Sequence, residues 1–109
     1  MTTTTTKIAE LNDQCRKSLF HPTLHLSVGI FNKNTTKINA ILELIKKFDS
    51  FTEENDPYGE HDFGSIEYKG EKIFWKIDYY DVNHKYLSED PADPAKTKRV
   101  ITVMLATEY

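Results

Sequence analysis

The chain has 109 residues, a net charge of −3 and 39% hydrophobic residues, which is enough for one modest core and too little for two domains. Its longest apolar run, residues 100–106 with a threonine inside, is far shorter than the ~18 residues that a membrane span needs. The first residues include five threonines and no apolar signal core, so we expect no export. We also expect residues 1–6 to be disordered. The single cysteine excludes an internal disulfide and suits the cytoplasm.

The first predicted element is a helix over residues 7–19. Its apolar residues recur at spacings of three and four and form one stripe: Ile8, Leu11, Cys15 and Leu19. Because Cys15 lies on that stripe, we expect a buried structural thiol rather than a nucleophile. Pro22 then ends the helix, since its ring is incompatible with a helix interior.

A strand and a second helix follow. Residues 24–31 alternate between apolar and polar side chains, which predicts a half-buried strand. Residues 32–36 are a polar turn that supplies a cap for a helix over residues 37–51. Charged residues of this helix lie away from an apolar stripe, as an amphipathic helix requires. The stripe consists of Ile38, Ile41, Leu42, Ile45 and Phe48.

A hairpin is predicted after an acidic loop. The pattern predicts two strands, over residues 63–68 and 71–80, joined by a two-residue turn at Lys69-Gly70. This turn sets a register in which Ile66 pairs with Ile73 and Tyr68 pairs with Glu71. One face then carries Ile66, Ile73, Trp75, Ile77 and Tyr79, and the other carries Phe63, Phe74, Asp78 and Tyr80. We expect the aliphatic and tryptophan face to meet the helices and the mixed face to lie nearer water.

The last third of the chain begins with a predicted loop over residues 82–98, because Pro91 and Pro94 are unsuited to a central strand. Asp93-Pro94 is a good helix start, whereas the β-branched residues after Arg99 favour a strand. We therefore predict a short helical turn and then a strand over residues 99–105. The expected fold is α+β, with about four antiparallel strands covered on one face by two helices, in a single domain over residues 7–109.

Acidic residues concentrate in one part of the chain. Residues 53–93 hold twelve acids against four lysines, a balance of −8, so the remainder carries +5. A negative surface repels nucleic-acid phosphate and attracts basic protein or nucleoprotein surfaces. The candidate binding residues are Glu53, Glu54, Asp56, Tyr58, Glu60, His61, Asp62, Asp78, Tyr80 and Asp81. The alternative is that these acids only solvate two long loops.

Glu60-His61-Asp62 is the most reactive-looking sequence. A carboxylate beside an imidazole acts as a general base or binds a divalent metal, so a metal-dependent hydrolase that uses these residues and Asp78 is the alternative function. Against it, residues 56–59 are a turn sequence, and Asp62 suits a backbone cap. The EF-hand spacing fails and one cysteine cannot build a thiolate zinc site, so we expect neither a metal nor a cofactor.

A third interpretation is a nucleic-acid-binding regulator. Aromatic residues on a sheet form stacking platforms for bases in RNA-binding proteins. The candidates here are Tyr58, Phe63, Phe74, Tyr79, Tyr80 and Tyr86. Their acidic surroundings oppose direct nucleic-acid binding. The nucleic-acid interpretation therefore rests only on basic residues, which occur in short groups at 16–17, 46–47 and 96–99 and which a solvated surface also explains.

Four stretches of sequence are specific enough to suggest a relationship. They are E-N-D-P-Y-G-E-H-D-F-G, F-W-K-I-D-Y-Y-D, D-P-A-D-P and R-V-I-T-V-M-L-A-T-E-Y. With them, the chain resembles a small bacterial family catalogued as "domain of unknown function 3768", from residue 8 to residue 109, with a departure between residues 17 and 34. The family carries no assigned activity and often lies on plasmids and other mobile elements. The resemblance therefore implies a context, such as inhibition of host machinery including antiphage defence, and no catalytic residue.

These observations together favour a small, non-enzymatic binding or regulatory protein. The expected partner is a basic protein or nucleoprotein surface, and the expected contact is the acidic and aromatic face defined above.

Overall fold

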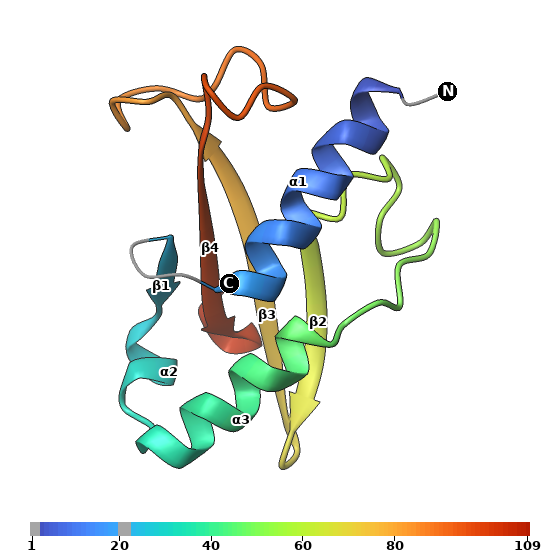
Figure 1. Ribbon diagram of the computed structural model, residues 1–109. Coiled ribbons are helices and arrows are strands. Elements are labelled where there is room, and N and C mark those ends of the chain that lie inside the picture. The colour runs from blue at the N-terminus through green and yellow to red at the C-terminus, as the bar shows by residue number, and fades with distance from the viewer. Residues whose placement is uncertain (1–2, 20–22) are drawn as a thin grey trace.

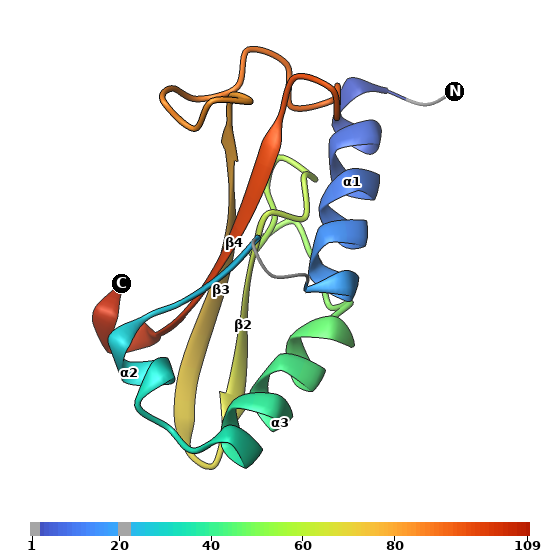
Figure 2. The same cartoon turned by 60° about the vertical axis from the view of Figure 1, so that its left-hand side comes forward.

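A four-stranded sheet carries two helices end to end on one of its faces (Figures 1 and 2). The structure is a computed structural model that describes residues 3–19 and 23–109. Its elements in chain order are α1 (Thr4–Ser18), β1 (Leu24–Leu26), α2 (Val28–Phe31), α3 (Thr35–Lys46), β2 (Phe63–Tyr68), β3 (Glu71–Tyr80), β4 (Lys98–Leu105) and the 3-10 helix η1 (Ala106–Glu108). Among the described residues, no helix combines the length and the apolar character needed to cross a membrane.

The strand order in the sheet is β1-β4-β3-β2. β3 is antiparallel to both β2 and β4, whereas β1 runs parallel to β4. The α+β class is confirmed, but the prediction of a purely antiparallel sheet is wrong at this edge, and the sheet is mixed. The alternation of apolar residues in β1 reports which face is buried and carries no information on strand direction, so the sequence pattern could not distinguish the two arrangements.

The predicted hairpin is confirmed in its strands and its register. Ile66 pairs with Ile73 and Tyr68 pairs with Glu71 across the Lys69-Gly70 turn. Both turn residues have positive φ, 50° and 83°, as the mirror-image turns of tight hairpins require. The helix-facing side of β3 therefore carries the residues that were predicted for it.

The two long helices have different ends from those predicted. α1 begins three residues early, at Thr4, because the Thr3 hydroxyl accepts a hydrogen bond from Thr6 N at 3.0 Å and caps the helix. Residues 4–6, expected to be disordered, are thus its first turn. α3 starts at Thr35, capped by Asn34, and stops at Lys46 instead of continuing to residue 51.

Residues 24–31 do not form one strand. β1 ends at Leu26, and Ser27 then caps the short helix α2 by accepting from Ile30 N. A strand would place Val28 and Ile30 on the same face, but Val28 is 73% exposed and Ile30 is fully buried. The Glu108 carboxylate accepts hydrogen bonds from the Ser27 hydroxyl and from Gly29 N, so residues at the far end of the chain stabilise this turn.

The strand predicted over residues 99–105 is confirmed as β4, but the helical turn before it is wrong. The Asp93 carboxylate accepts a hydrogen bond from Ala95 N at 2.9 Å, which closes a turn in place of a helix. The Thr97 hydroxyl donates to Asp90 O at 2.8 Å and closes the rest of this loop.

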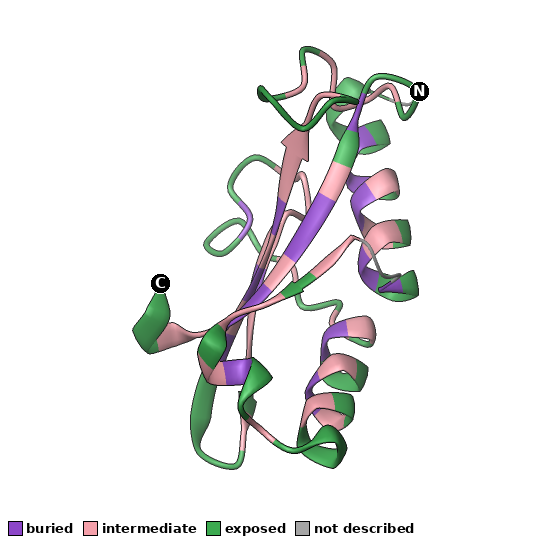
Figure 3. Ribbon diagram, turned by 90° about the vertical axis from the view of Figure 1, so that its left-hand side faces the viewer, coloured by how far each residue is buried: buried purple, intermediate pink, exposed green. Residues whose placement is uncertain are grey.

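Trp75 lies at the centre of the core, with no exposed surface. Figure 3 shows the buried stripes of α1 and α3 turned toward the sheet. Phe48 and Phe51 follow the end of α3 and still reach the core, where their ring centroids lie 5.6 and 6.1 Å from that of Trp75. The predicted placement of Trp75 with Ile73 and Ile77 against this part of the chain is confirmed.

Gly64 is expected to be required beside Trp75. A Cβ atom at residue 64 would lie 2.6 Å from Trp75 Nε1, and the buried indole cannot swing away. Gly64→Ala should therefore lower the free energy of unfolding by about 1–3 kcal/mol through overpacking. Urea unfolding of this variant beside Ser65→Ala, which alters the opposite face, measures the effect; equal stability of the two variants would contradict this packing.

Candidate functional site

Residues 47–62, which we call the acidic loop, connect α3 to β2 without a helix or a strand. The loop is nevertheless bonded internally. The Asn55 side chain accepts from Thr52 N at 2.8 Å and donates to Ser50 O at 2.9 Å. Asp56 N and Gly59 N donate to backbone oxygens within the loop, at 2.8 and 3.0 Å. Long loops with this much internal order are usually functional.

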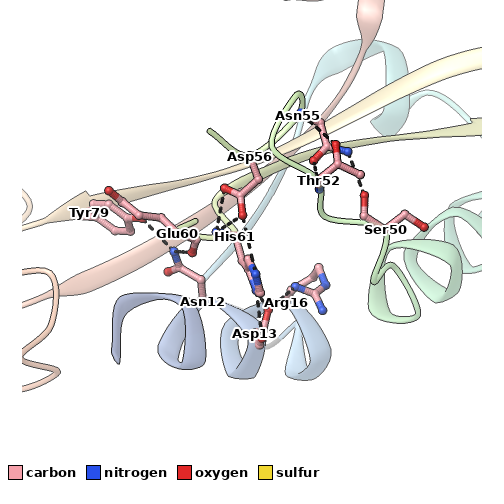
Figure 4. Close-up of polar contacts among 10 residues, drawn as sticks. All are labelled: Asn12, Asp13, Arg16, Ser50, Thr52, Asn55, Asp56, Glu60, His61 and Tyr79. Carbon is pink, nitrogen blue, oxygen red and sulfur yellow. Dashed lines mark hydrogen bonds and ion pairs between the residues drawn. The ribbon is translucent and has the colours of Figure 1, made fainter. Parts of the chain in front are cut away.

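Asp56 and His61 form the base of the loop (Figure 4). The buried Asp56 carboxylate accepts from His61 N at 3.2 and 3.3 Å, and His61 takes a positive φ of 57° to make that contact. The His61 ring stacks flat on Phe51, with 3.9 Å between centroids and 2° between planes. Its Nδ1 atom lies 3.0 Å from Asp13 Oδ1, so the imidazole joins the loop to α1.

Asp13 in turn bonds to Arg16, one turn further along α1. Arg16 Nη1 donates to Asp13 Oδ1 at 2.8 Å, and the Arg16 side chain is almost fully buried. Its guanidinium lies 5.3 Å from the Phe51 ring and 5.4 Å from the Trp75 ring, within cation–π range. Partial burial acts to raise the pKa of Asp13, but hydrogen bonds from Arg16 and His61 outweigh it and leave that pKa below its ordinary value.

A second set of contacts attaches Glu60 of the acidic loop to α1 and β3. The Asn12 amide donates to Glu60 O at 2.9 Å and to the Tyr79 hydroxyl at 2.8 Å, and that hydroxyl donates to Glu60 Oε1 at 2.8 Å. Arg99 Nε donates to Asn12 Oδ1 at 2.7 Å. Burial, and the hydrogen bond that Tyr79 donates to Glu60, raise the pKa of Tyr79 far above its ordinary value, so the phenol stays protonated and remains a donor.

The lowered pKa of Asp13 predicts a pH dependence of stability. A depressed folded-state pKa means that ionised Asp13 stabilises the fold in full above its ordinary value of 3.8, and that this contribution is lost as the pH falls through the lower folded value. Asp13→Asn should therefore have a smaller loss of unfolding free energy between pH 6 and about pH 2 than the unmodified protein. Asp49→Asn, at an exposed position of the loop, is the control and should keep the full dependence.

The structure divides nine of the ten predicted binding residues, all except Asp62, into three groups. Asp56, Glu60 and His61 lie together in the contacts that hold the loop on α1. Glu53, Glu54 and Tyr58 lie on the same loop but are exposed, Tyr58 by 81%. Asp78 and Tyr80 of β3, and Asp81 directly after it, lie elsewhere: Asp78 pairs with Lys76 at 3.2 Å, Tyr80 stacks on His84, and Asp81 accepts hydrogen bonds from Asn83 N and Lys85 N.

The four residues of the hydrolase alternative do not come together around Asp62. Burial, and then the charge of Glu60, raise the pKa of Asp62 above its ordinary value. Asp78 alternates with Ile77 and Tyr79 along β3 and so lies on the sheet face opposite to Tyr79 and its partner Glu60. Within residues 3–19 and 23–109, no group of three or more His, Cys, Asp or Glu side chains could hold a metal ion.

Cys15 lacks the features of a reactive thiol, and the six aromatic residues proposed to stack on bases do not share one surface. Cys15 is half-buried on α1, and burial raises the pKa of its thiol despite the nearby Arg99 and Arg16, the opposite of what a reactive thiolate needs. Of the six proposed stacking residues, Phe63 and Phe74 contact each other and Tyr109 on the sheet face away from the helices. Tyr79 lies on the opposite face, and Tyr58 and Tyr86 lie in loops.

Comparison with known proteins gives one finding. A family model described as "Protein of unknown function (DUF3768)" matches residues 4–108. The chain belongs to this family. No curated protein and no solved structure matches it. Family membership therefore supplies no residue roles, and the contacts described above are the basis for any functional assignment.

The half of the site that comes from α1 and β4 was not predicted from the sequence. Asn12 and Asp13 lie outside the predicted apolar stripe of α1 and were not predicted, whereas Arg16 and Arg99 were predicted only as members of short basic groups. Asn12 and Arg16 are both buried and lie four residues apart, with Ile8 one turn before them. That spacing puts two polar side chains on the inner face of a helix, and it is the signal from which they could have been found.

Proposed function

We propose that this protein is a non-enzymatic binding module whose acidic loop recognises a basic surface of another protein. The observation that carries the proposal is the attachment of the loop to α1 through Asp13, Arg16 and His61. A loop that is held in one conformation before binding loses little conformational entropy when a partner binds, and rigidly positioned loops are where binding residues concentrate.

The exposed residues of the loop have the chemistry of a recognition surface. Glu53 and Glu54 are exposed on the loop and have no ion-pair partner within the described part of the chain. Tyr58, 81% exposed, adds a large amphipathic ring of the kind that is enriched at protein interfaces. Carboxylates that the protein itself does not neutralise favour a partner with lysine or arginine side chains.

The catalytic alternative has less support. Of the four side chains that would serve a hydrolase, Glu60 accepts from the Tyr79 hydroxyl, His61 bonds to Asp13, and Asp78 pairs with Lys76 on the other face of the sheet. The contacts of Glu60 and His61 stabilise the loop. The mobile-element setting implied by the family resemblance suggests a concrete form of the binding function. The partner would be a basic protein or nucleoprotein of the host machinery, including antiphage defence, reached in the cytoplasm.

The exposed loop carboxylates should accelerate association with such a partner. Once the partner has been captured from the native host, Glu53→Gln/Glu54→Gln is expected to slow association by about two- to tenfold at low salt, because electrostatic steering is reduced. The difference should shrink at physiological ionic strength, where screening acts within ~8 Å. Stability should be unchanged, since exposed carboxylates contribute little to folding.

Glu10→Gln/Glu89→Gln is the matched control, because it removes the same charge from exposed positions outside the loop. This variant should associate at nearly the unmodified rate. Equal rates for the loop variant, the control variant and the unmodified protein at all salt concentrations would rule out the acidic loop as the recognition surface.

A further inference from the structure

The β2 edge of the sheet has backbone groups that are directed away from its neighbour. Ile77 N donates to Asp62 O at 2.8 Å, and this bond sets the alternation of the β2–β3 ladder. Gly64, Ile66 and Tyr68 consequently face β3, whereas Phe63, Ser65 and Glu67 direct their N–H and C=O groups outward. In the described part of the chain, none of these outward groups has a hydrogen-bond partner.

A groove follows the same edge. It has a volume of about 670 Å³ and is walled on the helix side by Leu44 and Phe48, and at one end by Ser50 and Asn55 of the acidic loop. A second hollow of about 360 Å³ continues it along β2 to Gly70. Leu44 is 40% exposed, so the apolar wall is open to water.

The edge also lacks the features that usually prevent another strand from pairing. Between Phe63 and Tyr68 there is no lysine and no proline, and the pairing with β3 continues without a bulge. Glu67 is the one charged residue of β2, and it lies opposite Lys72 across the hairpin. Lys72 lines both hollows. At the loop end, the exposed Glu53 and Glu54 directly precede Asn55, which lines the groove, and so place negative charge beside it.

We propose that β2 and this groove bind an extended, basic segment of a partner protein, which adds to the sheet as a fifth strand. Its backbone would pair with Phe63, Ser65 and Glu67, a length of about five residues at ~3.4 Å each. Alternate side chains would enter the groove against Leu44 and Phe48, and lysine or arginine residues would lie beside the acidic loop. This inference rests on the proposed function, because it states how the same partner is held.

The probe for the test is a library of random twelve-residue peptides displayed on phage, selected on the intact protein. Enriched peptides are expected to alternate apolar and basic residues. On binding of such a peptide, the amides of Ser65 and Glu67 should become protected from hydrogen exchange, because they gain partners, whereas Gly64 and Ile66 should change little. This readout uses the unmodified protein and does not depend on any variant folding.

Ser65→Pro gives the matching variant. Proline removes the outward N–H of Ser65 and leaves the bonds to β3 intact, as is tolerated on edge strands. Peptide affinity should fall at least about tenfold, whereas Ser65→Thr, which keeps the N–H, should bind normally. Trp75 fluorescence and thermal melting report whether both variants are folded.

Three results would overturn strand addition. They are the absence of enriched peptides, equal binding by Ser65→Pro, and unprotected Ser65 and Glu67 amides in the complex. A homodimer in the unbound protein that Ser65→Pro dissociates would show that a second copy occupies the edge instead. If bound peptides protect these amides but do not respond to Glu53→Gln/Glu54→Gln or to salt, strand addition stands and the acidic-loop proposal fails. If bound peptides respond to Glu53→Gln/Glu54→Gln and to salt but do not protect these amides, the acidic-loop proposal stands and strand addition fails.

Discussion

Trp75→Ala is expected to lower the free energy of unfolding by about 3–5 kcal/mol, a large part of the stability of a domain of this size. Trp75 has no exposed surface, and its ring contacts Phe48, Phe51 and the Arg16 guanidinium. Alanine would therefore leave a cavity and also remove the aromatic surface over which a buried cation lies. Urea unfolding followed by far-UV circular dichroism measures the loss, because the tryptophan signal is absent from the variant.

Tyr86→Ala is the control for that prediction. It also removes an aromatic ring, but Tyr86 is 74% exposed, so the change should be within about 0.5 kcal/mol. A loss below about 1 kcal/mol for Trp75→Ala, or similar losses for the two variants, would contradict the central position of Trp75 in the core.

Asp13→Ala should destabilise the protein by about 3 kcal/mol, because it leaves the Arg16 guanidinium buried without a carboxylate. Arg16 is 1% exposed, and its Nε atom has no hydrogen-bond partner within the described chain, so the loss of Asp13 removes the charge that compensates it. The same substitution removes the His61 contact, one of the two attachments of the acidic loop to α1, and leaves the bond from Asn12 to Glu60 O. Thermal or urea unfolding at pH 7 measures the change.

The double variant Asp13→Ala/Arg16→Met tests this explanation, because its free energy of unfolding should be higher than that of Asp13→Ala alone. It removes both members of the pair and places an apolar side chain of similar length between Phe51 and Trp75. Replacement of a buried pair by apolar residues is often nearly neutral, so the double variant should be more stable than Asp13→Ala alone by about 1–2 kcal/mol. A double variant that is less stable than Asp13→Ala would contradict the unpaired-charge explanation.

The parts of the fold that follow local periodicity were predictable. The β2–β3 hairpin, its Lys69-Gly70 turn and the buried position of Trp75 follow from alternation and turn chemistry over consecutive residues. The errors lie where a distant contact decides the local structure. Ser27 begins a helix in place of continuing a strand, and Glu108, eighty-one positions later, stabilises that turn. The parallel β1–β4 pairing likewise joins segments that are far apart in the sequence.

The candidate site was predictable only in part, for the same reason. The acidic loop and its Glu60, His61 and Asp56 are visible in the sequence as a polar segment before an aromatic strand. Their partners are not, because Asn12 and Tyr79 are sixty-seven positions apart, and Asn12 and Arg99 eighty-seven. Periodicity identifies the inner face of α1. It does not reveal that Asn12 on that face donates a hydrogen bond to the acidic loop, or that the Arg16 guanidinium lies over the Phe51 and Trp75 rings.

Amide hydrogen exchange of the unbound protein tests most directly whether the acidic loop is a fixed surface rather than a solvated connection. The amides of Asp56, Gly59 and His61 all donate hydrogen bonds within the loop. They should exchange at least about tenfold more slowly than in an unstructured chain, and this protection should be reduced in Asp13→Ala while Ile77 in β3 keeps its own. Exchange of these three amides at unstructured rates in the unmodified protein would contradict a loop held ready for binding.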